Sequence, residues 1–572
     1  MKQKLIRTPD GLFTLMRRHP YFLTFLICAL LLPFGFADRA KITTGSCVYL
    51  GVVTGIIAIA AIFLFNLGKN LQEKLLLSGI SVACAAACML IIGSVENKAV
   101  AVAFVALALI IAASAFLRFN NALSDTAIIA LLILLGIAIR FVYVLYTGSG
   151  DRQHDVGFWN WTWGHANYVE YWYNNGLKLP DFDVRNVWQY YHPPFHHWLM
   201  ALLLKLLTAL GVEYLTAAEA LQMLPMLYSS LSMIVSYRIF RMVKISGKPL
   251  MAAMAVMCFH PTFILFAGEF NNDILLFLLV MSAIMWGLRW YRDPRMGNII
   301  PLALCIGLGM MTKLSGWMVA PAVAFLFLCV LIRNIKKPGK YIGQYVVFGV
   351  ICVPLGVWWQ VRNLIKFDVP LTYVPLLSVD DPIYSGNLSV WERLFNFGGT
   401  QLTYVYDAFT AYGSPYNEFN PTLGLFKTAM FDEGTNSITA EHFPQIAVTA
   451  PILYWLSVIL ALLSLGCFIY MMVKKSDSVN GVERAYFSLL FGVQFVCYYM
   501  FAFAYPFTCT YNIRYAMPLI PLTVMGMGFV LQKTKDSEKA LTIWFRRLLY
   551  ALTAAFCAMS YIVYTQIGTT IL

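Results

Sequence analysis

Charged side chains are scarce in this sequence. Asp, Glu, Lys and Arg make up 12% of the 572 residues, whereas hydrophobic residues make up 60%. A typical soluble domain carries about 25% charged residues, so the composition excludes an ordinary soluble protein. The sequence also lacks a glycine-rich phosphate-binding loop, which argues against an enzyme that uses nucleotide sugars.

Paired cysteines of the kind that bind metals or form disulfide frameworks are missing as well. Most of the 12 cysteines lie inside apolar runs, such as Cys28, Cys84 and Cys258, where a thiol behaves as a small hydrophobe. The net charge is +13, but Lys and Arg separate the hydrophobic runs instead of clustering in one domain. This distribution indicates membrane topology and predicts no nucleic-acid partner.

Long apolar runs dominate what is present. Segments of about 20 apolar residues, long enough to cross about 30 Å of hydrocarbon as a helix, recur from Tyr21 to Ile567. They are apolar on all faces, whereas the strands of a membrane barrel alternate apolar and polar residues. The basic N-terminus shows no cleavage pattern, so the first run is interpreted as a retained helix. We therefore predict an all-α polytopic membrane protein.

The distribution of Lys and Arg predicts the orientation, because cytoplasmic loops carry most of the basic residues. Five helices between Tyr21 and Tyr146 lead to a polar segment outside the membrane. The short run Trp198 to Leu210 is predicted to lie at the membrane surface or to enter it only partly, because a crossing there would place Arg238 and Arg241 outside. The remaining runs, including Leu250 to Gly268 and Ile513 to Leu531, bring the total to about 15 transmembrane helices.

The first external loop is unusually rich in rings and acids. It holds five of the eight histidines and six of the 14 tryptophans. Five acidic residues lie in the same loop. Rings that pack on a pyranose, beside carboxylates that bind its hydroxyls, would form a sugar pocket. An interfacial aromatic belt is the alternative interpretation of the rings, and it leaves the acids unexplained. Metal binding by His192, His196 and His197 is less favoured, because Pro193-Pro194 interrupts the local helix.

Four motifs in order along the chain carry a family resemblance. They are the YHPPFHH segment from Tyr191 to His197, EFNND from Glu269 to Asp273, TKLSG from Thr312 to Gly316, and Arg514-Tyr515 followed by Pro518 and Pro521. With an early Asp in the first external loop, this set resembles the GT-C superfamily of polyprenyl-phosphate-sugar-dependent glycosyltransferases. It is most similar to the branch of protein O-mannosyltransferases and lipid A aminoarabinose transferases. The orientation derived from charge places all four motifs outside.

The resemblance implies a domain organisation. Residues 1–120 would be extra N-terminal transmembrane helices, for which we have no functional interpretation. Residues 121–572 would form the GT-C-like catalytic helical bundle, with large extracytoplasmic loops at 147–218 and 362–446. His154-Asp155 stands where the family often has Asp-Glu, and His192-Pro193 replaces an acidic-basic pair, so the identity of the sugar is not carried over.

The resemblance also implies a reaction and its residues. A sugar would pass from a polyprenyl-phosphate donor to a hydroxyl or amine of a protein, glycolipid or wall polymer, with inversion and with Asp155 as base. Arg514 and Lys313 would bind the phosphate, and Glu269 and Asp273 would bind a hydroxyl, an amine or a bridging Mg or Mn ion. No residues are assigned as metal ligands. The catalytic residues predicted are Asp155 and His154; the substrate-binding residues predicted are Glu170, Tyr191, His192, His196, Glu269, Asn272, Asp273, Lys313, Arg514 and Tyr515.

Two other function classes stay open. A transporter or flippase would need ionisable residues near mid-membrane and commonly two related halves, yet no internal repeat is visible. A membrane-embedded acyltransferase or polymer ligase would use His154 or His192 as its base. The short basic N-terminus favours a bacterial plasma membrane, with membrane lipids around the bundle and the active site on the extracytoplasmic face.

Overall fold

The computed structural model describes residues 124–150, 155–157, 163–397, 419–432, 446 and 448–566, with seven residues between 103 and 114. The first three predicted helices, most of the fourth, and His154 lie outside the described residues. Within the described part the regular elements are helices, and an isolated β-bridge joins Tyr384 to Phe507. The protein is thus an all-α, multi-pass membrane protein, as predicted.

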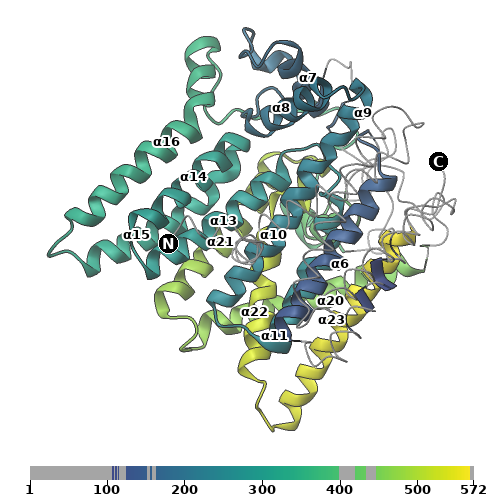
Figure 1. Ribbon diagram of the computed structural model, residues 1–572, viewed down its shortest axis with the longest axis vertical. Helices are drawn as coiled ribbons and strands as arrows, with labels where there is room; N and C mark the ends of the chain where they lie inside the picture. The colour runs from purple at the N-terminus through teal and green to yellow at the C-terminus, as the bar shows by residue number, and fades with distance from the viewer. Residues whose placement is uncertain are drawn as a thin grey trace, which may run out of the picture.

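Seven helical segments in the described part are long and apolar enough to span a membrane (Figure 1). They are α6 (Asp125–Tyr146), α13 (Asp273–Arg292), η3 (Leu314–Val319) with α15 (Ala320–Arg333), α16 (Gly339–Phe367), α20 (Thr449–Val473), α21 (Gly481–Ala504) and α23 (Ala540–Gln566). Four apolar helices are shorter: α8 (Phe195–Ala209), α11 (Gly247–Phe259), α14 (Met296–Thr312) and α22 (Leu519–Lys533). The remaining elements used below are α7 (His165–Asn174), α9 (Tyr214–Glu219), α10 (Met223–Met242), α12 (Pro261–Leu265), α17 (Val390–Phe395), α19 (Pro421–Phe431) and the 3₁₀ turn η6 (Ile513–Tyr515).

Two predicted helices are interrupted. The run Leu250 to Gly268 splits into α11 and α12 because His260 adopts an extended conformation, with ψ 123°, immediately before Pro261. A residue that precedes proline is disfavoured in the helical region. In the run Ile513 to Leu531 the helix begins only at Leu519, after the 3₁₀ turn η6. The prediction of continuous helices was wrong at both places, and the second interruption places Arg514 and Tyr515 at the candidate site.

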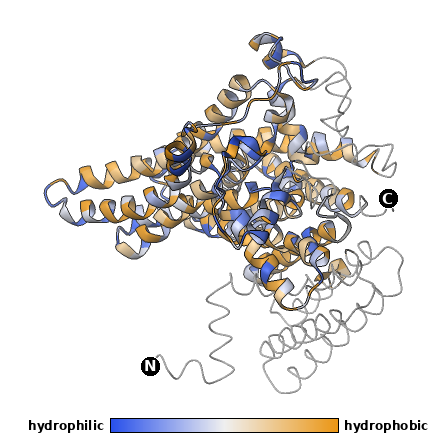
Figure 2. Ribbon diagram, turned by 90° about the horizontal axis from the view of Figure 1, so that it is seen from above, coloured by the Kyte–Doolittle hydropathy of each residue, from blue (hydrophilic) through white to orange (hydrophobic). Residues whose placement is uncertain are grey.

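The basic loops gather at one end of the bundle. Lys244 Nζ donates to the carbonyl of Asp477 at 3.1 Å, and Arg292 pairs with Glu483 at 2.7 Å. These contacts bring together turns that the positive-inside rule places on one side of the membrane. Figure 2 shows hydrophobic residues along most helices and hydrophilic residues concentrated at the turns.

A second, aromatic core lies beyond the main bundle. Trp172 of α7 and Met200 of α8 are fully buried in it together with Phe270, and Trp359 of α16 joins them. Figure 1 places α7, α8 and α9 together at one end of the molecule. The opposite face of α8 exposes Leu206, so this helix has one protein-facing side and one apolar outer side. Its location at the membrane surface stays a prediction.

Candidate active site

A cavity of about 1080 Å³ opens where α13 and η6 begin and where α14, α16 and α21 end. Its walls come from both predicted external loops, from the ends of α13, α14, α16 and α21, and from the 3₁₀ turn η6. One wall is apolar and includes Leu314, Trp317, Met318, Cys497 and Phe501. Seven of the predicted site residues line the cavity: Asp155, Tyr191, His192, Asp273, Lys313, Arg514 and Tyr515.

Lys313 and Asp273 form a short, buried ion pair in the cavity wall. Lys313 follows the last residue of α14, and its Nζ lies 2.6 Å from Asp273 Oδ1 in the first turn of α13. The two side chains are 13% and 2% exposed. Burial lowers the pKa of Lys313, and the Asp273 carboxylate opposes that change. Asp273 also lies at a helix N-terminus, where the helix dipole favours negative charge.

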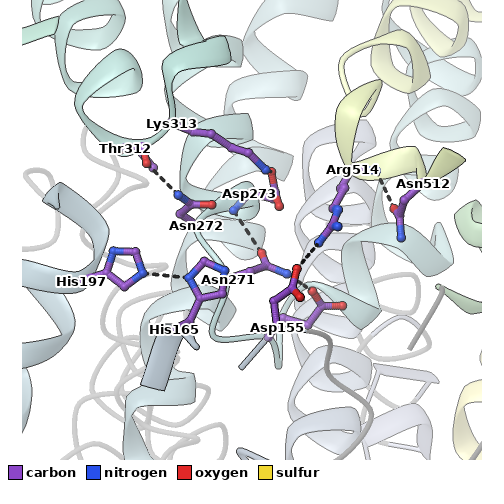
Figure 3. Close-up of polar contacts among 11 residues, drawn as sticks. Asp155, His165, His197, Asn271, Asn272, Asp273, Thr312, Lys313, Asn512 and Arg514 are labelled. Carbon is purple, nitrogen blue, oxygen red and sulfur yellow. Dashed lines mark hydrogen bonds and ion pairs between the residues drawn. The ribbon is translucent and has the colours of Figure 1, made fainter. Parts of the chain in front are cut away.

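Arg514 and Asp155 form a longer ion pair across the cavity. Their Nη1 and Oδ2 atoms are 3.7 Å apart, which exceeds the about 2.7–2.9 Å of a charge-assisted hydrogen bond (Figure 3). Arg514 is 6% exposed, whereas Asp155 is 36% exposed. Asn512 accepts the backbone N–H of Arg514 at 2.8 Å and so fixes the 3₁₀ turn that carries the guanidinium.

The backbone holds Asp155 in an uncommon conformation. Its φ is +55°, in the left-handed region that Asp tolerates better than most residues. The carbonyls of Asp155 and Val156 accept the N–H groups of His165 and Ala166 at 2.9 and 2.7 Å. At Gly157, with φ +59°, a Cβ atom would lie 2.0 Å from the carbonyl oxygen of Trp163. The segment 155–157, which carries the Asp155 carboxylate, is therefore anchored on the start of α7.

The ring of Tyr515 contacts both cations. Lys313 Nζ and the guanidinium carbon of Arg514 each lie 5.0 Å from its centroid. A ring at this distance attracts positive charge and brings two cations to one part of the wall. The arrangement supplies an ammonium and a planar guanidinium to any anion that enters the cavity, with a carboxylate beside each cation.

Four predicted binding residues lie outside the cavity lining, and one predicted catalytic residue lies outside the described part of the chain. His196 Nε2 contacts the carbonyl of Phe270 at 2.9 Å, and Asn272 donates to the carbonyl of Thr312 at 2.8 Å, next to Lys313. Glu269 is buried and contacts Asn271. Glu170, also buried, accepts the hydroxyl of Tyr214 at 3.1 Å. His154 lies outside the described residues.

His165 was not predicted as a site residue, and it lines the cavity. Its Nδ1 lies 2.8 Å from Nε2 of His197 (Figure 3). Its ring also stacks on His192, with centroids 5.8 Å apart. Burial lowers the pKa of His192 and His197 well below the usual range, and that of His196 to about 4. These imidazoles are therefore neutral at pH 7. The crowding of histidine in the first loop was the available sequence signal for His165.

The described residues contain no group of three or more His, Cys, Asp or Glu side chains arranged to hold a metal ion. In the cavity, Asp273 and Asp155 each have a cationic side chain as neighbour.

Comparison with known proteins agrees with the family resemblance. Residues 191–358 match the family model of dolichyl-phosphate-mannose-protein mannosyltransferases. This match confirms the resemblance to the mannosyltransferase branch of the GT-C superfamily, and it includes Tyr191, Asp273 and Lys313. No curated protein matches the sequence.

Two solved structures are among those to which this chain is similar. The archaeal oligosaccharyltransferase AglB from Archaeoglobus fulgidus, in complex with an inhibitory peptide and a dolichol-phosphate, is 14% identical, with 77% of this chain and 56% of that chain covered and a TM-score of 0.42. ArnT from Cupriavidus metallidurans in the apo state is 15% identical, with 77% of each chain covered and a TM-score of 0.35. This chain thus spans about half the length of the oligosaccharyltransferase.

Proposed function

We propose that this protein is a membrane glycosyltransferase that moves a sugar from a polyprenyl-phosphate donor to a hydroxyl or amine, with inversion at the anomeric carbon. The observation that carries the proposal is the pair of cations, Arg514 and Lys313, that meet at Tyr515 in a cavity with an apolar wall. The match to a mannosyltransferase family model supports the same reaction class.

The cavity suits both the phosphate group and the isoprenoid chain of a lipid phosphate. The planar guanidinium of Arg514 suits two oxygens of one phosphate, and the Lys313 ammonium adds a point charge. The departing polyprenyl phosphate gains negative charge in the transition state, and preorganised cations stabilise that charge. The apolar wall of Trp317, Met318 and Phe501 offers the isoprenoid chain a non-aqueous surface beside the phosphate.

Asp155 is the proposed base. Among the four charged groups of the two ion pairs, its carboxylate is the most exposed and the least tightly paired. A donor phosphate bound to Arg514 would replace Asp155 as the partner of the guanidinium. The carboxylate would then be released to take a proton from the acceptor as the acceptor attacks the anomeric carbon.

The acceptor would reach the cavity through the predicted external loops. Residues 369–375 of the second loop line the cavity, as do Trp163 and Trp188 of the first. Rings in such a position pack well against a sugar face. The proposal places this opening on the extracytoplasmic face of a bacterial plasma membrane, with a protein, glycolipid or wall polymer as acceptor.

Purified protein in nanodiscs, supplied with a panel of polyprenyl-phosphate sugars and a membrane extract, tests the proposal. We expect one donor to release free polyprenyl phosphate and to label a component of the extract. Glu483→Gln is the matched control, because this buried carboxylate pairs with Arg292 at the opposite end of the bundle. Absence of release with every donor, from protein that is folded by size-exclusion chromatography, would contradict the proposal.

A histidine base is the second candidate, because the neutral His192 ring lines the same cavity. It would fit an acyltransferase or polymer ligase better than a sugar transferase. Separate His192→Asn and Asp155→Asn variants distinguish the two. Activity that depends on Asp155 and tolerates the change at His192 supports glycosyl transfer, and the reverse pattern supports the histidine mechanism.

A further inference from the structure

Two asparagines hold the cavity's charged segments in the same way. Asn271 accepts the backbone N–H of Asp273 at 3.1 Å, and Asn512 accepts the backbone N–H of Arg514 at 2.8 Å. Each asparagine stands two residues before the charged residue whose backbone it binds. Each also donates its side-chain N–H to a carboxyl group: Asn271 to Glu269, and Asn512 to Asp432 at 2.7 Å.

The two carboxyl groups are neighbours. Glu269 is 1% exposed and Asp432 is 8% exposed, and the nearby Asp432 carboxyl helps to raise the pKa of Glu269. Two ionised carboxylates side by side in a buried site repel strongly, and a proton on one of them relieves the repulsion and allows a hydrogen bond between them. The oxygen of Glu269 that does not bind Asn271 receives no N–H or O–H from any other described residue.

Backbone strain at Asp432 points to the same place. This residue ends α19 with φ +57° and ψ −178°, a region occupied almost only by glycine. Such a conformation is strained and persists only where surrounding contacts fix it. The hydrogen bond from Asn512 to the Asp432 carboxyl at 2.7 Å is one of the contacts that hold it.

We propose that Glu269 and Asp432 share one proton and act as a positioning pair, which fixes the segment carrying Asp273 against the segment carrying Arg514. The pair lies outside the cavity lining, so it acts through Asn271 and Asn512 and not on the substrate. Its effect on catalysis rests on the proposed function, whereas its effect on stability does not. The glycosyl-transfer geometry depends on it because the Lys313–Asp273 and Arg514–Asp155 pairs belong to these two segments.

The number of donors in the bond makes the proposal testable. An acid–carboxylate bond has one donor and one acceptor, and so does an amide–carboxylate bond, so Glu269→Gln and Asp432→Asn should each be tolerated. In the double variant each amide oxygen still accepts from its own asparagine. The two NH₂ groups then face each other, and the bond is lost.

The experiment compares both single variants, the double variant and Glu483→Gln as the matched control of a buried carboxylate. The melting temperature, kcat and KM are measured for each. We expect the single variants to keep turnover within about threefold, and the double variant to lose about tenfold or more in kcat, because a displacement of about 1 Å near the chemistry costs up to about 100-fold. The melting temperature of the double variant should fall by more than the sum of the single changes.

Several results would overturn the positioning pair. Single variants as damaging as the double variant, or a double variant that behaves additively, would contradict a shared proton. A Glu269→Gln variant with an unchanged melting temperature and a raised KM would show that Glu269 binds substrate instead. If wild-type protein transfers no sugar, the proposed function fails, yet the melting temperatures still decide whether the pair exists.

The pH profile gives a second readout. Burial, the neighbouring Asp432 and Asp273 raise the pKa of Glu269 well above its usual range, and Arg514 opposes them. The contribution of the protonated pair is therefore fully present below the ordinary pKa of Glu and is lost as pH rises through the raised pKa. Wild-type melting temperature should decline toward alkaline pH, and both single amide variants, whose bond has no proton to lose, should flatten that decline. An alkaline decline that persists unchanged in both would contradict the proposal.

Discussion

The two ion pairs of the cavity differ in distance and in exposure. Lys313 and Asp273 are 2.6 Å apart and both largely buried, whereas Arg514 and Asp155 are 3.7 Å apart and Asp155 is 36% exposed. A tight buried pair is costly to break, because removal of one partner leaves an unpaired charge away from water. A looser, half-exposed pair exchanges partners at little cost. From this comparison we infer that the Lys313–Asp273 pair mainly stabilises the structure, whereas the Arg514–Asp155 pair exchanges partners during the proposed reaction.

The largest expected effect is on catalysis at the loose pair. Asp155→Asn removes the proposed base and should lower kcat by about 10²- to 10⁴-fold, the usual contribution of general base catalysis. KM for the donor should change little, because the cations remain. Steady-state release of polyprenyl phosphate measures both. Asp183→Asn, a change in the same loop that removes the partner of Arg185, is the control and should keep wild-type turnover.

Substitutions in the Lys313–Asp273 pair should mainly lower the free energy of unfolding. Lys313→Met leaves the Asp273 carboxylate buried without its partner and should destabilise the protein by about 3–5 kcal/mol. Adding Asp273→Asn to this variant should restore most of the melting temperature, since the buried charge is gone. Asp155→Asn should cost less than Lys313→Met by the same measurement, because Asp155 is 36% exposed and lies 3.7 Å from Arg514. Equal losses at the two pairs would remove the distinction between them.

A smaller effect should follow from the shape of the cation. Arg514→Lys keeps the charge but loses the planar, bidentate group, so donor KM should rise about tenfold with a smaller change in kcat. Lys313→Arg is the matched exchange at the buried pair, and there the bulkier group should mainly lower the melting temperature. A donor KM that is indifferent to Arg514→Lys would argue against phosphate binding by the guanidinium.

The smallest effect on turnover should come from the hydrogen bond between Tyr214 and Glu170, which lies outside the cavity lining. Tyr214→Phe removes the hydroxyl that donates to Glu170 at 3.1 Å. Loss of one hydrogen bond to a carboxylate should cost about 1.5–3 kcal/mol in stability at most, and turnover should stay within about twofold. A specific loss of donor or acceptor affinity in this variant would instead place Glu170 in the binding site.

From charge and from the order of the motifs, the sequence predicted that several residues of the candidate site lie on the same side. Lys313 and Arg514 were predicted to lie on the same side because the basic loops fixed the orientation, and both line one cavity. The helix break before Pro261 was missed, although the proline is visible in the sequence, because the apolar run was given more weight than the proline. The membrane-helix pattern itself needs only local composition, which explains why it was the most reliable part.

Other features depend on contacts that leave no local pattern. Glu170 shares a loop with Asp155, but the turn of α7 carries it to Tyr214 and away from the cavity lining. The roles of Asn512 and Asp432 arise from a hydrogen bond between segments that are distant in sequence, whereas Asn271 binds Glu269 and Asp273 within its own segment. The repeated spacing, an asparagine two residues before a charged residue, was the available signal.

The most direct measurement is an experimental structure of the protein with polyprenyl phosphate bound in a nanodisc. We predict that phosphate oxygens lie about 2.7–3.0 Å from both the Arg514 guanidinium and the Lys313 ammonium, with the isoprenoid chain along Trp317 and Phe501. The Asp155 carboxylate should have separated from Arg514. A phosphate bound elsewhere, with the Arg514–Asp155 pair still formed and the cavity empty of lipid, would contradict the account.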